Sequence, residues 1–239
     1  PPAAAGVIAS TPHAAAAAAQ KAAPSPQRSS ALDAAGYAYA LVRAADGGQV
    51  VTLDLDRTNR VRSAVYLYET RAQADAVRKA VMSARDKKAA PLALAKVPLG
   101  EAAALVLAPP AKREGVPGYF CHRLLVEQSR LAAARKITGI SDLGDRFLPL
   151  FYVDDDTGSR EASGGVQAFF DPKAAELVRK EATTCSDRRA AACEAYDASG
   201  RKRAFTVREA DAFVLLRRGG IDELDLVPST TMAADGSKS

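Results

Sequence analysis

Histidine is almost missing from this chain of 239 residues, which has only His13 and His122. Catalysis commonly requires a base beside a nucleophile, or a cluster of metal ligands. Three cysteines are present (Cys121, Cys185 and Cys193), with no CxxC pair among them. An odd number of unpaired cysteines indicates neither a disulfide framework nor a zinc site, and it excludes thioredoxin-type redox chemistry.

Long apolar runs and dense basic stripes are also missing. No apolar stretch approaches the roughly 18–20 residues that cross a bilayer, so we expect a chain that is soluble or at most peripheral to a membrane. The net charge of +5 is spread over short basic pairs without interleaved aromatic residues. This pattern argues against nucleic-acid binding and favours solvated surface loops.

Acidic residues are absent from the N-terminal stretch, which is rich in Ala, Pro and Ser. Residues 1–32 are predicted to be a disordered tail, because they carry too few large apolar side chains to offset the entropy of ordering. The composition fits a transit-peptide remnant or a linker. We therefore expect the folded domain at residues 33–228, in halves of about 33–110 and 111–228. An insertion loop at 183–203 and a flexible tail at 229–239 complete the predicted organisation.

A strand–cap–helix unit is present in the first half. Alternating apolar residues on either side of Asp46-Gly47-Gly48 predict a β-hairpin, and Ala64–Tyr68 predicts a third strand. Thr70 is a suitable N-cap for the helix that follows, whose apolar face recurs at helical spacing as far as about Arg85.

The same unit returns about a hundred residues later. The strand Val166–Phe170 leads into Asp171-Pro172, an N-cap followed by proline at the first helical position, and Ala174, Leu177 and Val178 are predicted to form the helix's apolar face. Aligned without gaps, Tyr68 meets Phe169 and Thr70 meets Asp171.

A third copy is predicted from Phe205, where Thr206 and Glu209 have the spacing of a capping box and Gly219-Gly220 ends the helix.

Between the strong copies we expect strands at Leu92–Val97, Phe120–Val126 and Phe147–Val153, and a helix at Arg130–Ile137. Pro149 favours an edge strand or a bulge for the last strand. These elements predict an α+β fold of two pseudo-symmetric halves, each a mixed β-sheet with packed helices and repeated strand–cap–helix units.

Several segments resemble, in order, those of the Tic-twenty-two family, the small soluble subunit of the translocon at the inner envelope membrane of chloroplasts. The segments extend over residues 37–228: Tyr68–Val81, Val97–Gly100, Phe120–Ile137, Pro149–Phe151, Phe169–Val178 and Ile221–Pro228. Two features depart from the family pattern, namely the insertion after Glu181 that carries two cysteines and the Asp145–Leu148 segment before the Pro-x-Phe strand.

The resemblance implies two pseudo-symmetric halves with apolar grooves, a plastid location in the envelope intermembrane space or the stroma, and chaperone-like binding of precursor proteins beside import-channel components. It implies a role in protein import without enzymatic activity or a cofactor. The alternative is an accessory structural subunit that uses the same fold inside a larger organellar assembly.

Candidate site residues follow from these patterns. An apolar groove is predicted from residues of both halves: Val97, Leu99, Leu105, Phe120, Leu124, Pro149 and Phe151. The alternative for each of them is an ordinary core position. The neighbours Cys121 and His122 would point to opposite faces of a strand and would not form a catalytic pair. The Asp154–Asp156 run is predicted to form a turn rather than a cation site, because Thr157-Gly158 follows it.

Overall fold

The computed structural model describes residues 28–56, 58–85, 90–143, 147–155, 166–183 and 204–228. It contains two compact units, the first ending at Glu127 and the second beginning at Gln128. This boundary lies later in the chain than the one near residue 110 that the sequence suggested. The predicted insertion loop and C-terminal tail lie outside the described residues, apart from the end of the helix that precedes the loop.

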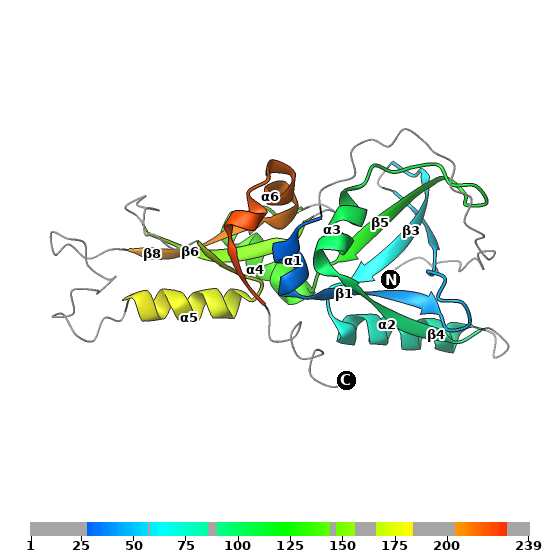
Figure 1. Cartoon of the computed structure of the whole chain (residues 1–239), viewed down its shortest axis with the longest axis horizontal. Helices are drawn as coiled ribbons and strands as arrows, with labels where there is room; N and C mark the ends of the chain where they lie inside the picture. Colours follow the sequence, from blue (N-terminus) through cyan, green and yellow to red (C-terminus); the bar gives the residue numbers. More distant parts are fainter. Residues whose placement is uncertain are drawn as a thin grey trace. The chain divides into compact units, whose positions relative to one another are not determined.

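Unit 1 is a five-stranded mixed sheet with three helices. Its elements are α1 (Ser30–Ala35), β1 (Tyr37–Arg43), β2 (Thr52–Leu55), β3 (Val61–Tyr68), α2 (Arg71–Ala84), β4 (Leu92–Pro98), α3 (Leu99–Leu107) and β5 (Tyr119–Leu125). β1 lies between β4 and β3, and β5 pairs with β3 in parallel. Figure 1 shows α2 on one side of β1 and β4, with α1 and α3 on the other.

Unit 2 is a four-stranded sheet with helices α4 to α6. Its elements are α4 (Gln128–Thr138), β6 (Pro149–Asp155), β7 (Gln167–Phe169), α5 (Pro172–Thr183), β8 (Phe205–Asp211), α6 (Ala212–Arg218), a 3-10 turn (Ile221–Glu223) and β9 (Asp225–Val227). The strand order is β8-β6-β7-β9, with β7 and β9 parallel.

The two sheets repeat one topology. In unit 1, β1 pairs antiparallel with β3 and β4, and β5 pairs in parallel with β3, the strand that precedes α2. In unit 2, β6 pairs antiparallel with β7 and β8, and β9 pairs in parallel with β7, the strand that precedes α5. β1, β3, β4 and β5 therefore correspond to β6, β7, β8 and β9, while β2 is an addition of unit 1. This confirms the α+β class and the two similar halves.

The two strong strand–cap–helix units are confirmed. The hydroxyl of Thr70 accepts from the Gln73 N–H at 3.3 Å at the start of α2, and Asp171 Oδ1 accepts from the Lys173 N–H at 2.9 Å at the start of α5. Both helices bury alanine against the sheet, Ala74 in α2 and Ala175 in α5.

The third strand–cap–helix unit is present, but its capping residue and the boundary between strand and helix differ from the prediction. Residues Phe205–Asp211 form strand β8, so Thr206 and Glu209 lie in a sheet ladder rather than in a capping box. Helix α6 begins later, and Asp211 is its N-cap, accepting from the Phe213 N–H at 3.0 Å. Its end is as predicted, because Gly219 adopts the left-handed conformation at the C-cap (φ 76°).

Other local expectations also change. The hairpin around Gly47 is reduced to a single bridge between Val42 and Gln49, and β2 pairs along its length with β3 instead. Pro149 is the first residue of β6, a central strand, where its missing N–H interrupts no ladder bond. Leu177 is 60% exposed on α5 rather than part of its apolar face.

The fold starts before residue 33. Helix α1 begins at Ser30, capped by the hydroxyl of Ser29, which accepts from the Leu32 N–H at 3.2 Å. Leu32 is fully buried, and α1 packs on α3. Residues 1–27 of the predicted tail lie outside the described parts of the chain.

Candidate apolar binding surface

The two faces of the unit 1 sheet have different partners. Tyr39, Leu41 and Tyr68 form a core cluster with Ala74, Val77 and Val81 of α2. Side chains alternate between the two faces along each strand, so the neighbouring residues face the other side, where α3 packs on β1, β4 and β5.

Five of the seven residues predicted for the groove come from this α3 side of unit 1. Val97 of β4 is paired with Ala38, and Leu124 of β5 with Leu67, all on the face away from α2. The predicted set comprises buried Val97, Leu99 and Leu124, and partly exposed Leu105 and Phe120. The structure thus brings together residues from two strands and one helix.

The other two residues, Pro149 and Phe151, belong to unit 2 and are buried there. Phe151 packs in a core cluster with Ala134, Phe169 and Ala175, on the side of the sheet that α4 and α5 cover. It is therefore a core residue of unit 2. A groove made by all seven residues remains a prediction.

The most exposed apolar side chains of unit 1 were not among the predicted site residues. Leu55 and Val61 are direct partners in the β2–β3 pairing, 58% and 45% exposed. Val61 lies two residues before Ser63, the partner of Phe120, so both aliphatic side chains share the α3 side with Phe120. Partly exposed Leu53 lies next to them on β2.

We call this set the α3-side surface, defined by Leu53, Leu55, Val61, Leu105 and Phe120. Among the described residues, β2 packs on no helix beyond isolated contacts, which explains why its apolar side remains open. The alternation of Leu53 and Leu55 with Asp54 and Asp56 is visible in the sequence. It identifies an apolar side of the strand, but it does not tell whether a helix covers that side.

Phe120 has a partly polar environment. Its ring meets that of His122 edge to face, with centroids 5.1 Å apart, and the Arg113 guanidinium lies 4.8 Å from its centroid. Burial, with a smaller contribution from Arg113, lowers the pKa of His122. At neutral pH His122 is therefore an uncharged, aromatic neighbour of the surface.

The segment before β5 fixes the edge of the α3-side surface. Ala111 and Phe120 exchange two backbone hydrogen bonds (3.1 and 2.7 Å), and the Ser63 hydroxyl donates to the Pro117 carbonyl at 2.6 Å. Gly118 passes so close to Val61 that an added Cβ would lie 2.1 Å from the Val61 carbonyl oxygen. Only glycine is compatible with this approach and its φ of 70°.

Polar side chains occupy the opposite face of the same hairpin. Arg62 donates two hydrogen bonds to Asp54 (2.6 and 2.7 Å), and the Tyr66 hydroxyl also donates to Asp54. Burial opposes ionisation of Asp54, but the hydrogen bonds from Arg62 and Tyr66 outweigh it and lower its pKa. Burial and Asp54 together raise the pKa of Tyr66 to about 12, so the tyrosine remains a donor.

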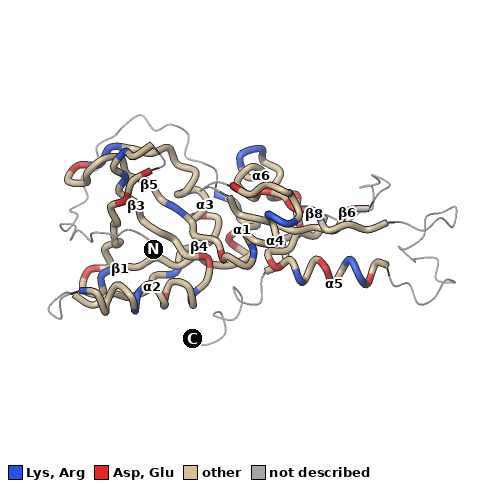
Figure 2. The backbone as a smooth tube through the Cα atoms, turned by 180° about the vertical axis from the view of Figure 1, so that it is seen from behind, with Lys and Arg blue, Asp and Glu red and all other residues tan. Residues whose placement is uncertain are grey.

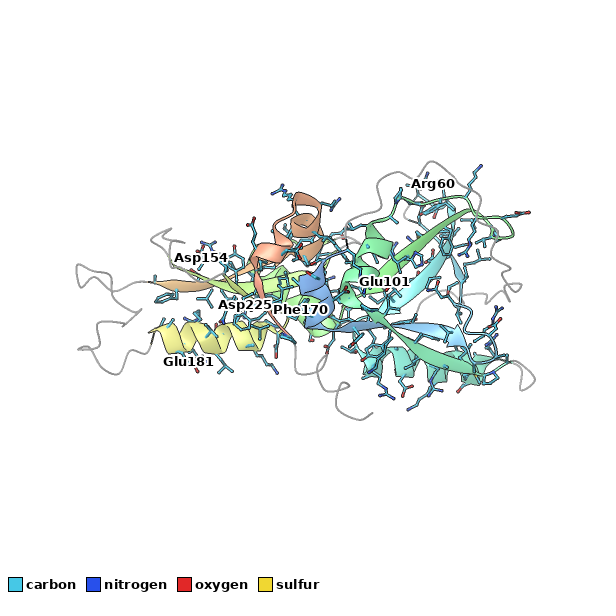
Figure 3. The ribbon with its side chains drawn as sticks, viewed as in Figure 1. Arg60, Glu101, Asp154, Phe170, Glu181 and Asp225 are labelled. Carbon is cyan, nitrogen blue, oxygen red and sulfur yellow. The ribbon has the colours of Figure 1, made fainter. Side chains whose placement is uncertain are left out.

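The turn between β2 and β3 is fixed in the same way. Asp56 accepts from the backbone N–H groups of Thr58 (2.8 Å) and Arg60 (3.0 Å), and from the Tyr119 hydroxyl (3.0 Å). Arg60 lies at this end of unit 1 (Figure 3). The hairpin therefore holds its charges on one face and in its turn, and presents leucine and valine on the other.

The described residues offer little for catalysis. Cys121 is buried beside Ala64 of β3, while His122 faces the opposite side, as expected from strand geometry. In the described ranges, no group of three or more His, Cys, Asp or Glu residues could hold a metal ion. Asp154 and Asp155 continue strand β6 rather than begin a turn; Asp156 and the other two cysteines lie outside these ranges.

Where the described parts of the two units correspond, two apolar residues of the α3-side surface have no apolar equivalent in unit 2. Leu99 starts α3 with a hydrogen bond to Gly36, and Ala212 starts α6 with the matching bond to Leu148. Counting along each helix, Leu105 then corresponds to Arg218. β9 is shorter than β5 and has no counterpart of Phe120. In the described parts of unit 2, Leu105 and Phe120 of the α3-side surface therefore have no apolar counterpart.

Comparison with solved structures identifies the fold of this two-unit α+β chain, in which one sheet topology occurs twice. The fold is that of Tic22: Anabaena Tic22 (protein transport) matches with a TM-score of 0.51 and 15% identity, over 83% of this chain and 90% of the other. Tic22 from Plasmodium falciparum matches with a TM-score of 0.56 and 12% identity, over 85% and 92% of the two chains.

The other comparisons found nothing. No protein-family model matches the chain, and no curated protein matches it. The two structural matches confirm the Tic22-like fold that the sequence suggested.

Proposed function

We propose that this chain is a protein-transport factor that binds precursor proteins in a chaperone-like, non-enzymatic manner, with import-channel components as further partners. Two solved structures with this fold are Tic22 proteins, one of them described as a protein-transport protein. The proposed location is a plastid, in the envelope intermembrane space or the stroma. In the described parts of the chain, no helix combines the length and apolar character needed to cross a membrane.

The observation that carries the proposal is the exposure of Leu55 and Val61. A soluble domain usually buries paired aliphatic side chains, and contiguous exposed apolar patches tend to mark interaction sites. Here the pair lies on one hairpin, beside partly exposed Phe120 and on the same side as Leu105. Such a surface suits an extended apolar segment, whose side chains can lie along the strands.

The difference between the units supports a binding role for unit 1. Ala212 and Arg218 of unit 2 stand where unit 1 has Leu99 and Leu105. Packing in the common fold thus does not require large apolar residues at these two positions. Leu99 is fully buried in unit 1, so of these two residues only partly exposed Leu105, on the same side as the exposed aliphatic pair, adds to the surface that we propose for binding.

The test compares two variants of the full chain. Leu55→Ser/Val61→Ser removes the exposed pair, and Leu177→Ser is the matched control, since Leu177 is 60% exposed on α5 of unit 2. Binding of a fluorescent, permanently unfolded precursor is followed by anisotropy. Since burial of each aliphatic side chain contributes about 1.5–3 kcal/mol, we expect the double variant to bind at least about tenfold more weakly. The control should bind like the unmodified chain.

Affinity purification from the native organelle separates this role from the alternative. Recovery of precursors and import-channel components, lost in the double variant, supports transport. One stable stoichiometric complex, recovered equally with both variants, would instead favour an accessory structural subunit.

A further inference from the structure

Glu209 of β8 is a carboxyl group on the core side of the unit 2 sheet. Its strand partner is Phe151, which is fully buried, and Val207, two residues earlier on the same face, packs against the same cluster. Helices α4 and α5 both pack on β8. The side chain of Glu209 therefore begins on a face where its nearest strand neighbours include buried Phe151 and the aliphatic Val207, with Asp211 as a second acid on the same strand and face.

The carboxyl group is poorly provided with partners. Within the described parts of the chain, Glu209 Oε1 is buried and has no hydrogen-bond partner. An unpaired carboxylate in such a place is costly, whereas a neutral carboxylic acid is tolerated better. In agreement with this geometry, burial, followed by the charge of Asp211, raises the pKa of Glu209 to about 7.

The charged groups on the surrounding elements do not neutralise Glu209. Asp211, on the same strand and face, adds a like charge, and its own nearby cation is Arg217 of α6. From α4, Arg130 donates to the Pro149 carbonyl at 2.7 Å and lies over the Phe170 ring.

No cation of α5 or β6 contributes to the shifted pKa of Glu209, which results from burial and Asp211. On α5, Arg179 pairs with Glu176, and the inward residues are Ala174, Ala175 and Val178. On β6, Pro149, Phe151 and Val153 share the face of Glu209, and none of these three is charged.

The fold does not require an acid at this position. In unit 1 the residue opposite Tyr39 is Lys96, as Glu209 is opposite Phe151. Lys96 is exposed and places its ammonium group 5.3 Å from the centre of the Tyr37 ring. The same place in the repeat thus carries an exposed cation in one unit and a partly buried acid, with one buried carboxyl oxygen, in the other.

We propose that Glu209 is a proton-binding group built into the core face of β8, and that loss of its proton loosens the packing of β8 against α4 and α5. The group is protonated in the closed state and ionises when β8 opens to water. Opening therefore becomes easier as the pH rises from the carboxyl's ordinary pKa towards its folded value, and levels off above it. Unit 2 acquires a proton-dependent stability that does not depend on the proposed transport role.

Hydrogen exchange of the full chain, read by mass spectrometry between pH 5 and pH 8.5 and expressed as protection factors, tests the proposal. We expect protection of β8 amides to fall several-fold, up to about tenfold, per pH unit between about pH 5 and pH 7. The amides of β1 and β4 in unit 1 provide the internal reference. Glu209→Gln should abolish the pH dependence in β8, and Glu176→Gln, on the exposed side of α5, should leave it intact.

A second readout keeps the test decisive if Glu209→Gln alters the fold. In the unmodified chain, the signal of the Glu209 carboxyl carbon is followed by NMR as the pH changes. That signal is identified as the one missing from the spectrum of a Glu209→Met variant. A midpoint near 7 supports the proposal. A midpoint near the ordinary value of glutamate, or an unchanged pH dependence of β8 protection in Glu209→Gln, would overturn it.

Discussion

Phe151 of β6 lies directly opposite Phe169 of β7 in the antiparallel ladder of unit 2. Tyr39 and Tyr68 form the corresponding pair in unit 1, and each pair packs on the helix that follows its second strand. An aromatic pair at the same point of both sheets shows that the repeat preserves the site where the crossover helix docks. It also explains why Phe151 is a core residue.

The first prediction concerns this pair. Phe151→Ala should destabilise the protein by about 3–5 kcal/mol, because it removes a fully buried ring from a packed cluster. Phe151→Ser should likewise impair folding more than binding. Urea unfolding followed by circular dichroism measures the loss. A stability close to that of the unmodified chain would show that Phe151 is not part of the core.

The second prediction concerns the approach of Gly118 to Val61. Gly118→Ala and Gly115→Ala both place a side chain at positive φ (70° and 72°), which costs about 1–2 kcal/mol. Only at Gly118 would the new Cβ clash with backbone, since Gly115 has nothing within 4 Å. Thermal unfolding should therefore show a distinctly larger loss for Gly118→Ala. Equal losses would contradict the described geometry of this segment.

The third prediction uses the lowered pKa of Asp54. A carboxyl whose pKa is lower in the folded state stabilises the fold above its unfolded pKa, and this contribution is lost as the pH falls through the folded value. Asp54→Asn should therefore cost about 1–2 kcal/mol at pH 7, because it deprives Arg62 of its charged partner. The difference should shrink below about pH 4.

Asp75→Asn is the control for this series. Asp75 pairs with Arg78 on the surface of α2, a helix that carries several charged residues (Figure 2), and exposed ion pairs contribute little. A loss at pH 7 no greater than that of the control would refute the stabilising role of Asp54.

The fourth prediction concerns the N-terminus. Deletion of residues 1–27 should leave the unfolding temperature unchanged, because that stretch carries few large apolar side chains. Deletion of residues 1–33 should lower it clearly, since it removes the Ser29 cap and fully buried Leu32. Differential scanning calorimetry of the two truncated chains measures both unfolding temperatures. A large loss with the shorter deletion would show that the stretch stabilises the domain.

The parts of the fold that the sequence predicted correctly depend on local chemistry. Thr70 and Asp171 are cap residues followed by apolar residues at helical spacing, and both signals act within a few residues. Thr206 and Glu209 show the limit of such signals. Their spacing equals that of a capping box, but pairing along the whole of β6 outweighs it.

The candidate site required information that a single strand does not contain. Leu53 and Leu55 show the alternation of a half-buried strand, and only the position of α3 reveals that their apolar side stays open. Pro149 and Phe151 were assigned to a groove for the opposite reason. Their motif suggested an edge strand, whereas β8 and β7 flank β6 on both sides. Exposure depends on neighbours distant in sequence.

Site-specific photo-crosslinking shows which residues of the α3-side surface contact a bound precursor. A benzoylphenylalanine placed at Leu55, at Val61 or, as the control, at Leu177 of the full chain is irradiated with an unfolded precursor bound. We expect precursor adducts from positions 55 and 61 and none above background from position 177, although all three side chains are well exposed. Adducts from position 177 alone, or equally from all three positions, would contradict a binding surface on the α3 side of unit 1.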